Sequence, residues 1–331
     1  MAKLCATMFA NLRNESAYDR KLDDFIHHEF GLSEVPNTLY HYTKTETLGS
    51  IATDQTIWAF CHLDMPADKN ELRSLESVID EVLVDLQRTT TGPASDVLTE
   101  FAGRHPSLRA ADKIQAALRC FTSEPDSLPH WHKFTAGGQG VCVGFSTLRD
   151  EPMSEIFAGH HEQSVLRVEY DLEVWRGRLR AGFQHLLDAC NGLAKSKNWV
   201  RSATIRHRTL VGMAEIAALA SIASKGTEFQ DEKEWRHAIV PNPDGPPVAW
   251  EVIQGRRYLP LPARASGKLL FIERVIVRSP DPQQMVGRVD QMLREAGYGS
   301  VGAPMPTISI STHPFGARDG DAAEPRLAAA E

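Results

Sequence analysis

Apolar and polar residues alternate in several short stretches of the chain, and such alternation predicts β-strands. Side chains on a strand point to opposite faces in turn, and β-branched and aromatic residues are enriched there. Helices of uneven length separate these stretches, so the pattern predicts a mixed α+β sheet rather than a doubly wound parallel sheet. The predicted strands are Thr38–Thr43, Ile57–Phe60, Leu118–Thr122, Gly140–Phe145, Val165–Tyr170, Lys233–Val240, Leu269–Val277 and Thr307–Ser311.

Apolar residues spaced three or four apart predict helices between the strands, because that spacing places them on one helix face. Two further helical stretches are expected between residues 89 and 117. Pro125–Pro129 is predicted as a loop, and Gly137, Gly138 and Gly140 as a turn before the next strand. The other predicted helices are Ser16–Phe30, Glu46–Thr53, Asn70–Arg88, Val174–Lys195, Ile205–Ser224 and Gln283–Ala296.

The length of 331 residues allows one large domain or two smaller ones. A single α+β domain over residues 37–315 is predicted, because its polar motifs have to converge on one site. It carries helical insertions at about 70–117 and 174–224. Residues 1–36 are predicted to form an N-terminal helical extension, and residues 316–331, rich in Ala, Asp and Gly, a flexible tail.

Composition places the chain among ordinary globular proteins, with 42% hydrophobic and 24% charged residues. A net charge of -7 argues against general attraction to nucleic acid or anionic lipid. No apolar run reaches the ~18 residues of a membrane helix, and the start lacks a signal peptide, so the expectation is a cytoplasmic protein that does not enter a membrane. The oligomeric state stays open.

One stretch departs from this acidic balance. Between Arg176 and Arg208 there are eight Lys and Arg residues and a single acid, Asp188. One hypothesis is that this stretch holds NAD phosphates or a nucleic-acid acceptor. The competing interpretation is a solvated helical face.

Cysteine and histidine residues do not indicate a metal site or a disulfide framework. The five cysteines are scattered, with no CxxC pair, which is typical of reduced thiols. His130 and His132 lack a carboxylate or cysteine at suitable local spacing, so no metal is expected.

Three separated segments concentrate polar and aromatic groups, and together they resemble a known bacterial family. They are YHYT at Tyr40–Thr43, CFTS to HWHKF at Cys120–Phe134, and DEKEWR at Asp231–Arg236. With the GV.GF strand that follows the second segment, they resemble the domain of unknown function two-nine-seven-one, from about Leu39 to Ile308. The chain departs from that family at Phe134, where Tyr is usual, and at His130 and His132, where Met and a small polar residue are usual.

The same order of segments is also similar to ADP-ribosyltransferases, which bind NAD in the cleft of a split β-sheet. This resemblance implies that His41 binds the cofactor ribose, with Tyr42 or Thr43 assisting, and that Glu234 is the catalytic carboxylate. It implies that Glu232 is the first acid of an E-x-E pair and orients the acceptor. The further candidates for the NAD site are Phe121, Thr122, Trp131, Phe134 and Arg236.

The chemistry of NAD cleavage agrees with these residue types. Breaking the bond between nicotinamide and ribose develops positive charge on the sugar, which a carboxylate stabilises. Glu232 and Glu234 are two residues apart, so within a strand they are expected on one face. Trp131 and Phe134 offer flat rings for stacking on nicotinamide or adenine.

Structural interpretations compete with each of these roles. The segment around Glu234 is also typical of an edge strand with solvated or ion-paired Glu and Arg and an inward Trp235. Arg236 then only pairs with a neighbouring carboxylate, and His41 is a hydrogen-bonded histidine on a half-buried strand. Trp131 and Phe134 are equally typical of a core.

The leading hypothesis is an ADP-ribosyltransferase-like enzyme that cleaves NAD and transfers ADP-ribose to an unidentified protein or nucleic acid, in bacterial toxin, antiphage or stress biology. The competing hypothesis is a non-catalytic module that binds a nucleotide or a partner. A third is an RNA nuclease or 2'-phosphotransferase. Such transferases usually carry further basic residues beside the His motif, where this chain has only Lys44.

Overall fold

The computed structural model describes residues 35–61, 64, 71–109, 116–146, 161–193, 199–241, 250–262, 272–313 and 315. The helix predicted at Ser16–Phe30, nearly all of the predicted extension and the tail at 316–331 lie outside the described residues. No helix within the described ranges is long and apolar enough to span a membrane.

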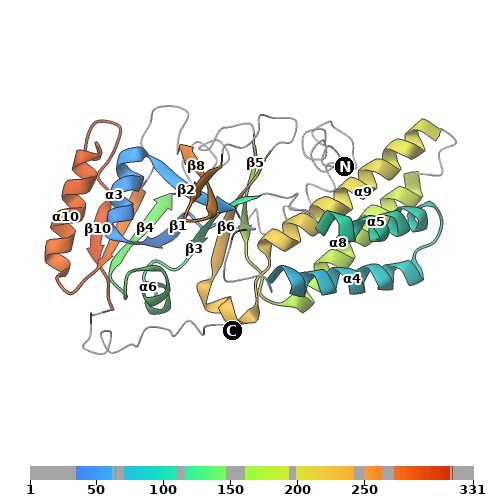
Figure 1. The fold of residues 1–331 in the computed structure, drawn as a ribbon, viewed down its shortest axis with the longest axis horizontal. Helices are drawn as coiled ribbons and strands as arrows, with labels where there is room; N and C mark the ends of the chain where they lie inside the picture. The colour runs from blue at the N-terminus through green and yellow to red at the C-terminus, as the bar shows by residue number, and fades with distance from the viewer. Residues whose placement is uncertain are drawn as a thin grey trace.

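In the described part of the chain, ten strands form one mostly antiparallel sheet, and the predicted α+β class is confirmed (Figure 1). The main path runs β10-β9-β4-β1-β3-β2-β8-β7, with β9 and β10 parallel, and β6 and β5 branch from β3. The strands are β1 (Thr38–Thr43), β2 (Thr56–Cys61), β3 (Ala117–Thr122), β4 (Gly140–Ser146), β5 (His161–Arg167), β6 (Glu234–Pro241), β7 (Glu251–Ile253), β8 (Arg256–Pro262), β9 (Ile272–Arg278) and β10 (Thr307–Ile310).

The sheet splits at β3. One edge of β3 pairs with β6 along all six residues. The other edge is shared, because β1 pairs with it at Thr122 and β2 pairs with it at Leu118 and Ala117. The backbone between those positions, Arg119 to Phe121, therefore faces a gap between β1 and β2. This gap positions the site described below.

Two helices cover the face of the sheet that carries Leu39 and Val143. α3 (Thr45–Asp54) and α10 (Pro282–Glu295) pack against each other beside β9 and β10 (Figure 1). Leu48 of α3 and Val289 of α10 are fully buried in one apolar cluster with Val275 of β9. Asp281 accepts a hydrogen bond from the backbone N–H of Gln284 and so caps α10.

A short helix, α6 (Leu128–Phe134), covers the opposite face near β1. Its Trp131 is fully buried with Tyr42 of β1, and the two rings meet edge to face at 4.9 Å. The indole N–H of Trp131 donates to Asp126 at 2.7 Å, and Asp126 also accepts from Ser311 and Thr312 after β10. One carboxylate thus ties α6 to the chain that follows the last strand.

Four long helices form a bundle beside the sheet, which makes the molecule elongated (Figure 1). Their apolar faces build one large cluster, in which Trp175 and Phe183 are fully buried. Leu118 and Leu166 of the sheet belong to the same cluster, so the bundle and the sheet share a core. The helices are α4 (Glu71–Thr89), α5 (Pro93–Arg109), α8 (Leu172–Leu193) and α9 (Trp199–Ala223).

Several predicted boundaries were wrong. The strand predicted at Val165–Tyr170 is β5, His161–Arg167, because its pairing with β6 begins at His161. The loop predicted at Pro125–Pro129 contains the start of α6, where Pro129 lies in the first turn and needs no backbone N–H. The hairpin of β7 and β8 was not predicted.

Candidate functional site

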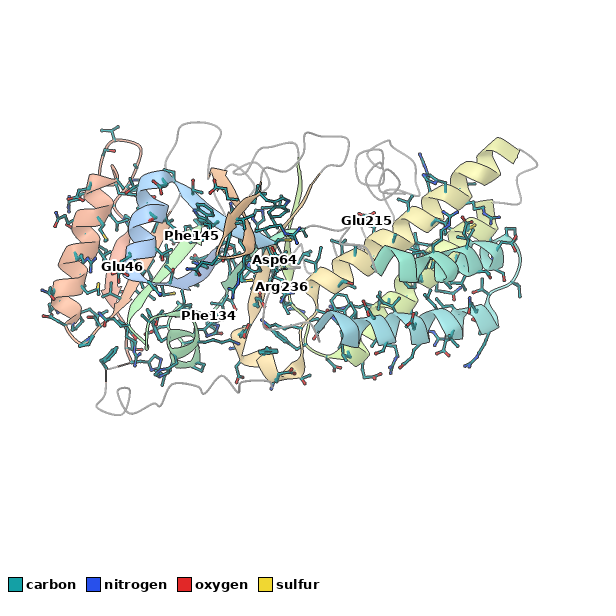
Figure 2. All side chains as sticks on the ribbon, in the orientation of Figure 1. Glu46, Asp64, Phe134, Phe145, Glu215 and Arg236 are labelled. Carbon is teal, nitrogen blue, oxygen red and sulfur yellow. The ribbon has the colours of Figure 1, made fainter. Side chains whose placement is uncertain are left out.

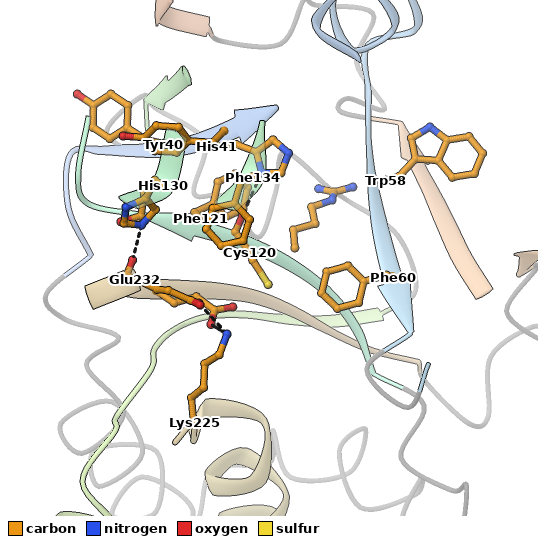
Figure 3. Close-up of a pocket in the computed structure, with 14 residues that line it drawn as sticks. Tyr40, His41, Trp58, Phe60, Cys120, Phe121, His130, Phe134, Lys225 and Glu232 are labelled. Carbon is orange, nitrogen blue, oxygen red and sulfur yellow. Dashed lines mark hydrogen bonds and ion pairs between the residues drawn. The ribbon is translucent and has the colours of Figure 1, made fainter. Parts of the chain in front are cut away.

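A cavity of about 260 Å³ lies at the gap between β1 and β2. Its lining comes from segments far apart in the sequence: β1, β2, β3, α6 and the chain from the end of α9 to the start of β6 (Figure 3). The lining residues are Tyr40, His41, Tyr42, Trp58, Phe60, Arg119, Cys120, Phe121, Thr122, His130, Phe134, Lys225, Glu232 and Glu234.

His41 of β1 reaches into the gap and bonds the exposed edge of β3. Its Nδ1 lies 3.0 Å from the carbonyl oxygen of Cys120, which can only accept a hydrogen bond. Nδ1 therefore carries the proton, and Nε2 of the neutral ring is an acceptor. Burial, with a smaller effect of the Arg119 charge, lowers the pKa of His41, so the ring is neutral at pH 7. The histidine presents an acceptor atom rather than a charge.

Glu234 begins β6 and is held as an ionised carboxylate in the interior, 3% exposed. Burial alone raises the pKa of a carboxyl group, but the charges of Arg236 and Lys225 outweigh it and lower the pKa of Glu234 to about 2. Arg236 donates from Nε to Oε1 at 3.0 Å and from Nη2 to Oε2 at 3.2 Å. Lys225 Nζ donates to Oε2 at 3.1 Å.

Arg236 itself stays behind this carboxylate and does not line the cavity. Its Nη1 donates to the carbonyl oxygens of Ile222 at 2.7 Å and Ser224 at 3.3 Å. These carbonyls belong to the C-terminal end of α9, where a cation is favourable. Arg236 therefore links the bundle to Glu234 at the junction between the bundle and the sheet (Figure 2).

Glu232 also contacts Lys225, although it does not lie on the strand that carries Glu234. The expectation that Glu232 and Glu234 share the face of one strand was wrong, since Glu232 ends the 3-10 helix η3 (Thr227–Glu232). Lys233, with φ of 42°, turns the chain between them. Lys225 Nζ donates to Glu232 Oε2 at 2.7 Å, and Lys133 of α6 pairs with Oε1. Lys225 thus bridges the two glutamates (Figure 3).

His130 fixes the neighbouring wall. Its Nε2 donates to the backbone oxygen of Glu232 at 2.9 Å, so its Nδ1 accepts from the Ser127 hydroxyl at 2.7 Å. Burial lowers the pKa of His130. The ring stacks on Tyr42 with centroids 5.1 Å apart, and Tyr42 Oη donates to the Glu124 backbone oxygen. This wall is hydrogen-bonded, uncharged and aromatic.

Residues 130–237, which contain His130, Lys225, Glu232 and Glu234, match the model of a family described as a protein of unknown function. This segment is therefore similar to the DUF2971 family. No curated protein and no solved structure matches the chain, so the resemblance to ADP-ribosyltransferases stays a prediction.

The structure brings most of the predicted site residues together, some from outside the DUF2971 segment. The predicted residues that line the cavity are His41, Tyr42, Phe121, Thr122, Phe134, Glu232 and Glu234. Three others do not line it. Arg236 lies behind Glu234, Trp131 is packed in the core, and the buried Thr43 lies at the end of β1. The pairing of Arg236 with a neighbouring carboxylate agrees with the structural interpretation.

The edge-strand interpretation of the segment around Glu234 was wrong in one respect. β6 lies between β3 and β5 and is not an edge, so Glu234 and Arg236 are buried rather than solvated. Trp235 packs inward as that interpretation expected, in the cluster with Phe121.

Sequence reasoning did not select Lys225, Arg119, Trp58 or Phe60. Lys225 lies two residues beyond the end of α9 and carries no local signal, since its role depends on two glutamates that approach it only in the fold. Arg119 is a buried cation within a strand of apolar residues, and such a residue is unusual enough to have been a clue.

Four arginines of the basic stretch, Arg176, Arg178, Arg180 and Arg206, pair with acids of α4, α5, α8 or the chain just before α8. Arg176 pairs with Glu81 and Glu173, and Arg180 lies 3.5 Å from Asp85. Arg178 also pairs with Glu169, and Arg206 pairs with Glu100 and Asp96. A polyanion would have to compete with these carboxylates, which favours the interpretation as an ordinary solvated helical face.

Within the described ranges, no group of three or more His, Cys, Asp or Glu side chains is placed to hold a metal ion.

Proposed function

We propose that the protein is an ADP-ribosyltransferase-like enzyme that cleaves NAD and passes ADP-ribose to a macromolecular acceptor. One observation carries this proposal: His41 and Glu234, which come from distant parts of the chain, line the same cavity. Had they lain on different sides of the sheet, this chemistry would have been untenable.

The state of Glu234 supports a role in stabilising positive charge. Because the pKa of Glu234 is about 2, the carboxylate is ionised throughout the neutral range. Arg236 donates hydrogen bonds to both oxygens of the Glu234 carboxylate and so orients the carboxylate before a ligand binds. Preorganised charge of this kind is what an oxocarbenium-like transition state requires, since no further rearrangement is needed during the reaction.

His41 and the aromatic walls supply the remaining parts of an NAD site. The acceptor atom Nε2 of His41 suits a ribose hydroxyl, which donates a hydrogen bond. Phe121 and the 42% exposed Phe134 offer rings against which nicotinamide can stack. In the proposed reaction, the bond between nicotinamide and ribose breaks, nicotinamide leaves with the bonding electrons, and the acceptor atom bonds the ribose carbon as it loses a proton.

One observation favours a second candidate, a nucleotide-binding module without catalysis. Both oxygens of Glu234 already accept hydrogen bonds, from Arg236 and from Lys225. These three bonds use most of the roughly four acceptor sites of the carboxylate, so a ribose hydroxyl competes with these donors. Lys225 is the donor that also lines the cavity, so we expect it to move when the ligand binds.

Incubation with NAD carrying separate labels on the nicotinamide and on the adenylate part distinguishes the two. The enzyme is expected to release nicotinamide and to label a protein or nucleic-acid acceptor. Glu234→Gln is expected to reduce nicotinamide release about a hundredfold or more, since one preorganised polar group contributes roughly that factor.

Glu173→Gln, on the exposed surface of α8, is the matched control and is expected to retain full activity. Absence of nicotinamide release and of label transfer, with NAD bound to the folded protein, would overturn catalysis and establish the binding module. Equal release by wild type and folded Glu234→Gln would remove Glu234 from the mechanism.

A further inference from the structure

The cavity is too small to enclose a dinucleotide. Its volume of about 260 Å³ lies below the ~300–1,000 Å³ typical of pockets for drug-sized ligands. A molecule that places one ring and sugar beside His41 and Glu234 must therefore extend past the cavity mouth. Figure 3 shows two sides of the cavity along which such a molecule can extend: one with Tyr40 and His130, and the other with Trp58 and Phe60 of β2.

Arg119 lies on the β2 side of the gap and is a buried cation of the cavity. It follows Leu118, which pairs with β2, and precedes Cys120, whose carbonyl His41 bonds. Only 2% of Arg119 is exposed, and burial lowers its pKa to about 9, so it is still charged at pH 7. An anion beside Arg119 would lower the cost of keeping this charge in the interior.

The two carboxylates of the cavity are already paired with cations, so neither opposes an anion at Arg119 as an uncompensated charge. Glu232 and Glu234 are the two lining carboxylates, and Lys225 and Arg119 are the two lining cations. Lys133 and Arg236 each bind one of those carboxylates from outside the lining. The lining thus holds two cations and two carboxylates, both carboxylates are already paired with cations, and the lowered pKa values of His41 and His130 keep both rings neutral.

Trp58 provides an aromatic ring on the β2 side of the same cavity. It alternates with Ile57 and Ala59, which are buried on the opposite face of β2, and it is 37% exposed. Tyr258 of β8 contacts its ring edge to face, with centroids 6.1 Å apart, and so supports its orientation. A large, partly exposed ring at a cavity mouth is costly in water and is suited to stacking on a flat base.

We propose that Arg119 and Trp58 form a subsite for the ADP part of the ligand, in which Arg119 binds the diphosphate and Trp58 stacks on the adenine. The assignment of this subsite to NAD rests on the proposed function. Binding of ADP alone tests the subsite separately from catalysis. The ligand then runs from Glu234 and His41, along the gap in the sheet past Arg119, to Trp58 on β2.

The test measures binding of ADP, adenosine and inorganic pyrophosphate to the full chain by calorimetry. Trp58→Ala is expected to weaken ADP and adenosine by about tenfold or more, because stacking on one aromatic ring contributes roughly that factor. Trp58→Phe is expected to retain most of the affinity. Arg119→Gln is expected to weaken ADP by about tenfold or more and to leave adenosine unchanged, since only ADP carries the diphosphate.

Pyrophosphate is expected to compete with ADP in wild type and to lose this effect in Arg119→Gln. Val252→Ala, on the exposed edge strand β7, is the control for surface changes on the same sheet. If Arg119→Gln fails to fold, Arg119→Lys replaces it, with a smaller loss of ADP affinity expected because the charge remains but the planar fork is lost.

Wild-type protein that does not bind ADP, or ADP affinity unchanged in Trp58→Ala, overturns the subsite. The same measurements distinguish a failure of the subsite from a failure of the catalytic proposal. If nicotinamide is released but ADP binding does not depend on Trp58 and Arg119, the subsite is refuted and the proposed function is retained. ADP binding that depends on both residues, without nicotinamide release, supports the subsite and removes the catalytic proposal.

Discussion

Acidification is expected to destabilise the protein through Glu234, by an amount that follows from its environment. The pKa of Glu234 is lowered from the usual 4.5 to about 2 by Arg236 and Lys225, which outweigh the effect of burial. A difference of this size corresponds to ~3 kcal/mol of folding free energy. Because the folded pKa lies below the unfolded one, this stabilisation is complete above pH 4.5 and is lost as the pH falls through about 2.

The measurement is urea unfolding followed by tryptophan fluorescence, at a series of pH values from 7 to 2. The free energy of unfolding of wild type is expected to fall between pH 5 and pH 2 by about 3 kcal/mol more than that of Glu234→Gln. At pH 7 the variant is expected to be less stable by ~3–5 kcal/mol, because Arg236 and Lys225 lose a buried counter-charge. Circular dichroism establishes that the variant is folded before its activity is compared.

Glu173→Gln is the control, since the side chain of Glu173 is 71% exposed and its substitution is expected to preserve the pH dependence of wild type. The reasoning is refuted if wild type and Glu234→Gln differ by the same free energy at every pH. Such a result would mean that Glu234 has the same affinity for a proton in the folded and unfolded chains.

Three further predictions concern stability and are measured by urea unfolding at pH 7. Asp126→Ala is expected to cost ~2–4 kcal/mol, because the buried indole N–H of Trp131 and the chain after β10 lose their acceptor, whereas full stability would show that this carboxylate is dispensable. Gly140→Ala is expected to be strongly destabilising, because the added methyl group would meet the backbone of β1. Gly103→Ala, whose methyl group would face open space, is the control and is expected to be neutral or stabilising. Equal effects of the two substitutions on the free energy of unfolding would contradict this geometry. Arg206→Gln is expected to cost less than ~1 kcal/mol, since its ion pairs are partly exposed, and a larger loss would indicate a role that the surface geometry does not explain.

Periodicity located most of the secondary structure correctly, for a physical reason. The alternation of Thr38–Thr43 and the helical stripe of Asn70–Arg88 are properties of neighbouring residues, and both elements form close to the predicted bounds, as β1 and α4. Strand ends were less predictable. β5 begins four residues early because β6 provides a partner as far as Pro241, and that pairing is not encoded near Val165.

The candidate site was also predictable from the sequence only in part. His41 and Glu234 were selected from motifs, which report the identity of a residue but not its contacts. Motif spacing suggested that Glu232 and Glu234 share a strand face. The chain instead turns at Lys233, which has a positive φ, so the two glutamates do not lie on one strand. The two carboxylates meet because Lys225 attracts both, and this cation lies in a segment without any recognisable pattern.

The order of hydrophobic and polar residues thus decided the α+β class, the positions of most helices and strands, and the three segments that carry the polar groups, since all of these depend on local periodicity. The tertiary structure alone decided that the sheet divides at β3, that Arg236 stands behind Glu234, and that acids of α4 and α5 pair with arginines of α8 and α9. Each of these features joins residues from distant parts of the chain. Their charges and hydrogen bonds depend on distances that exist only once the core has formed.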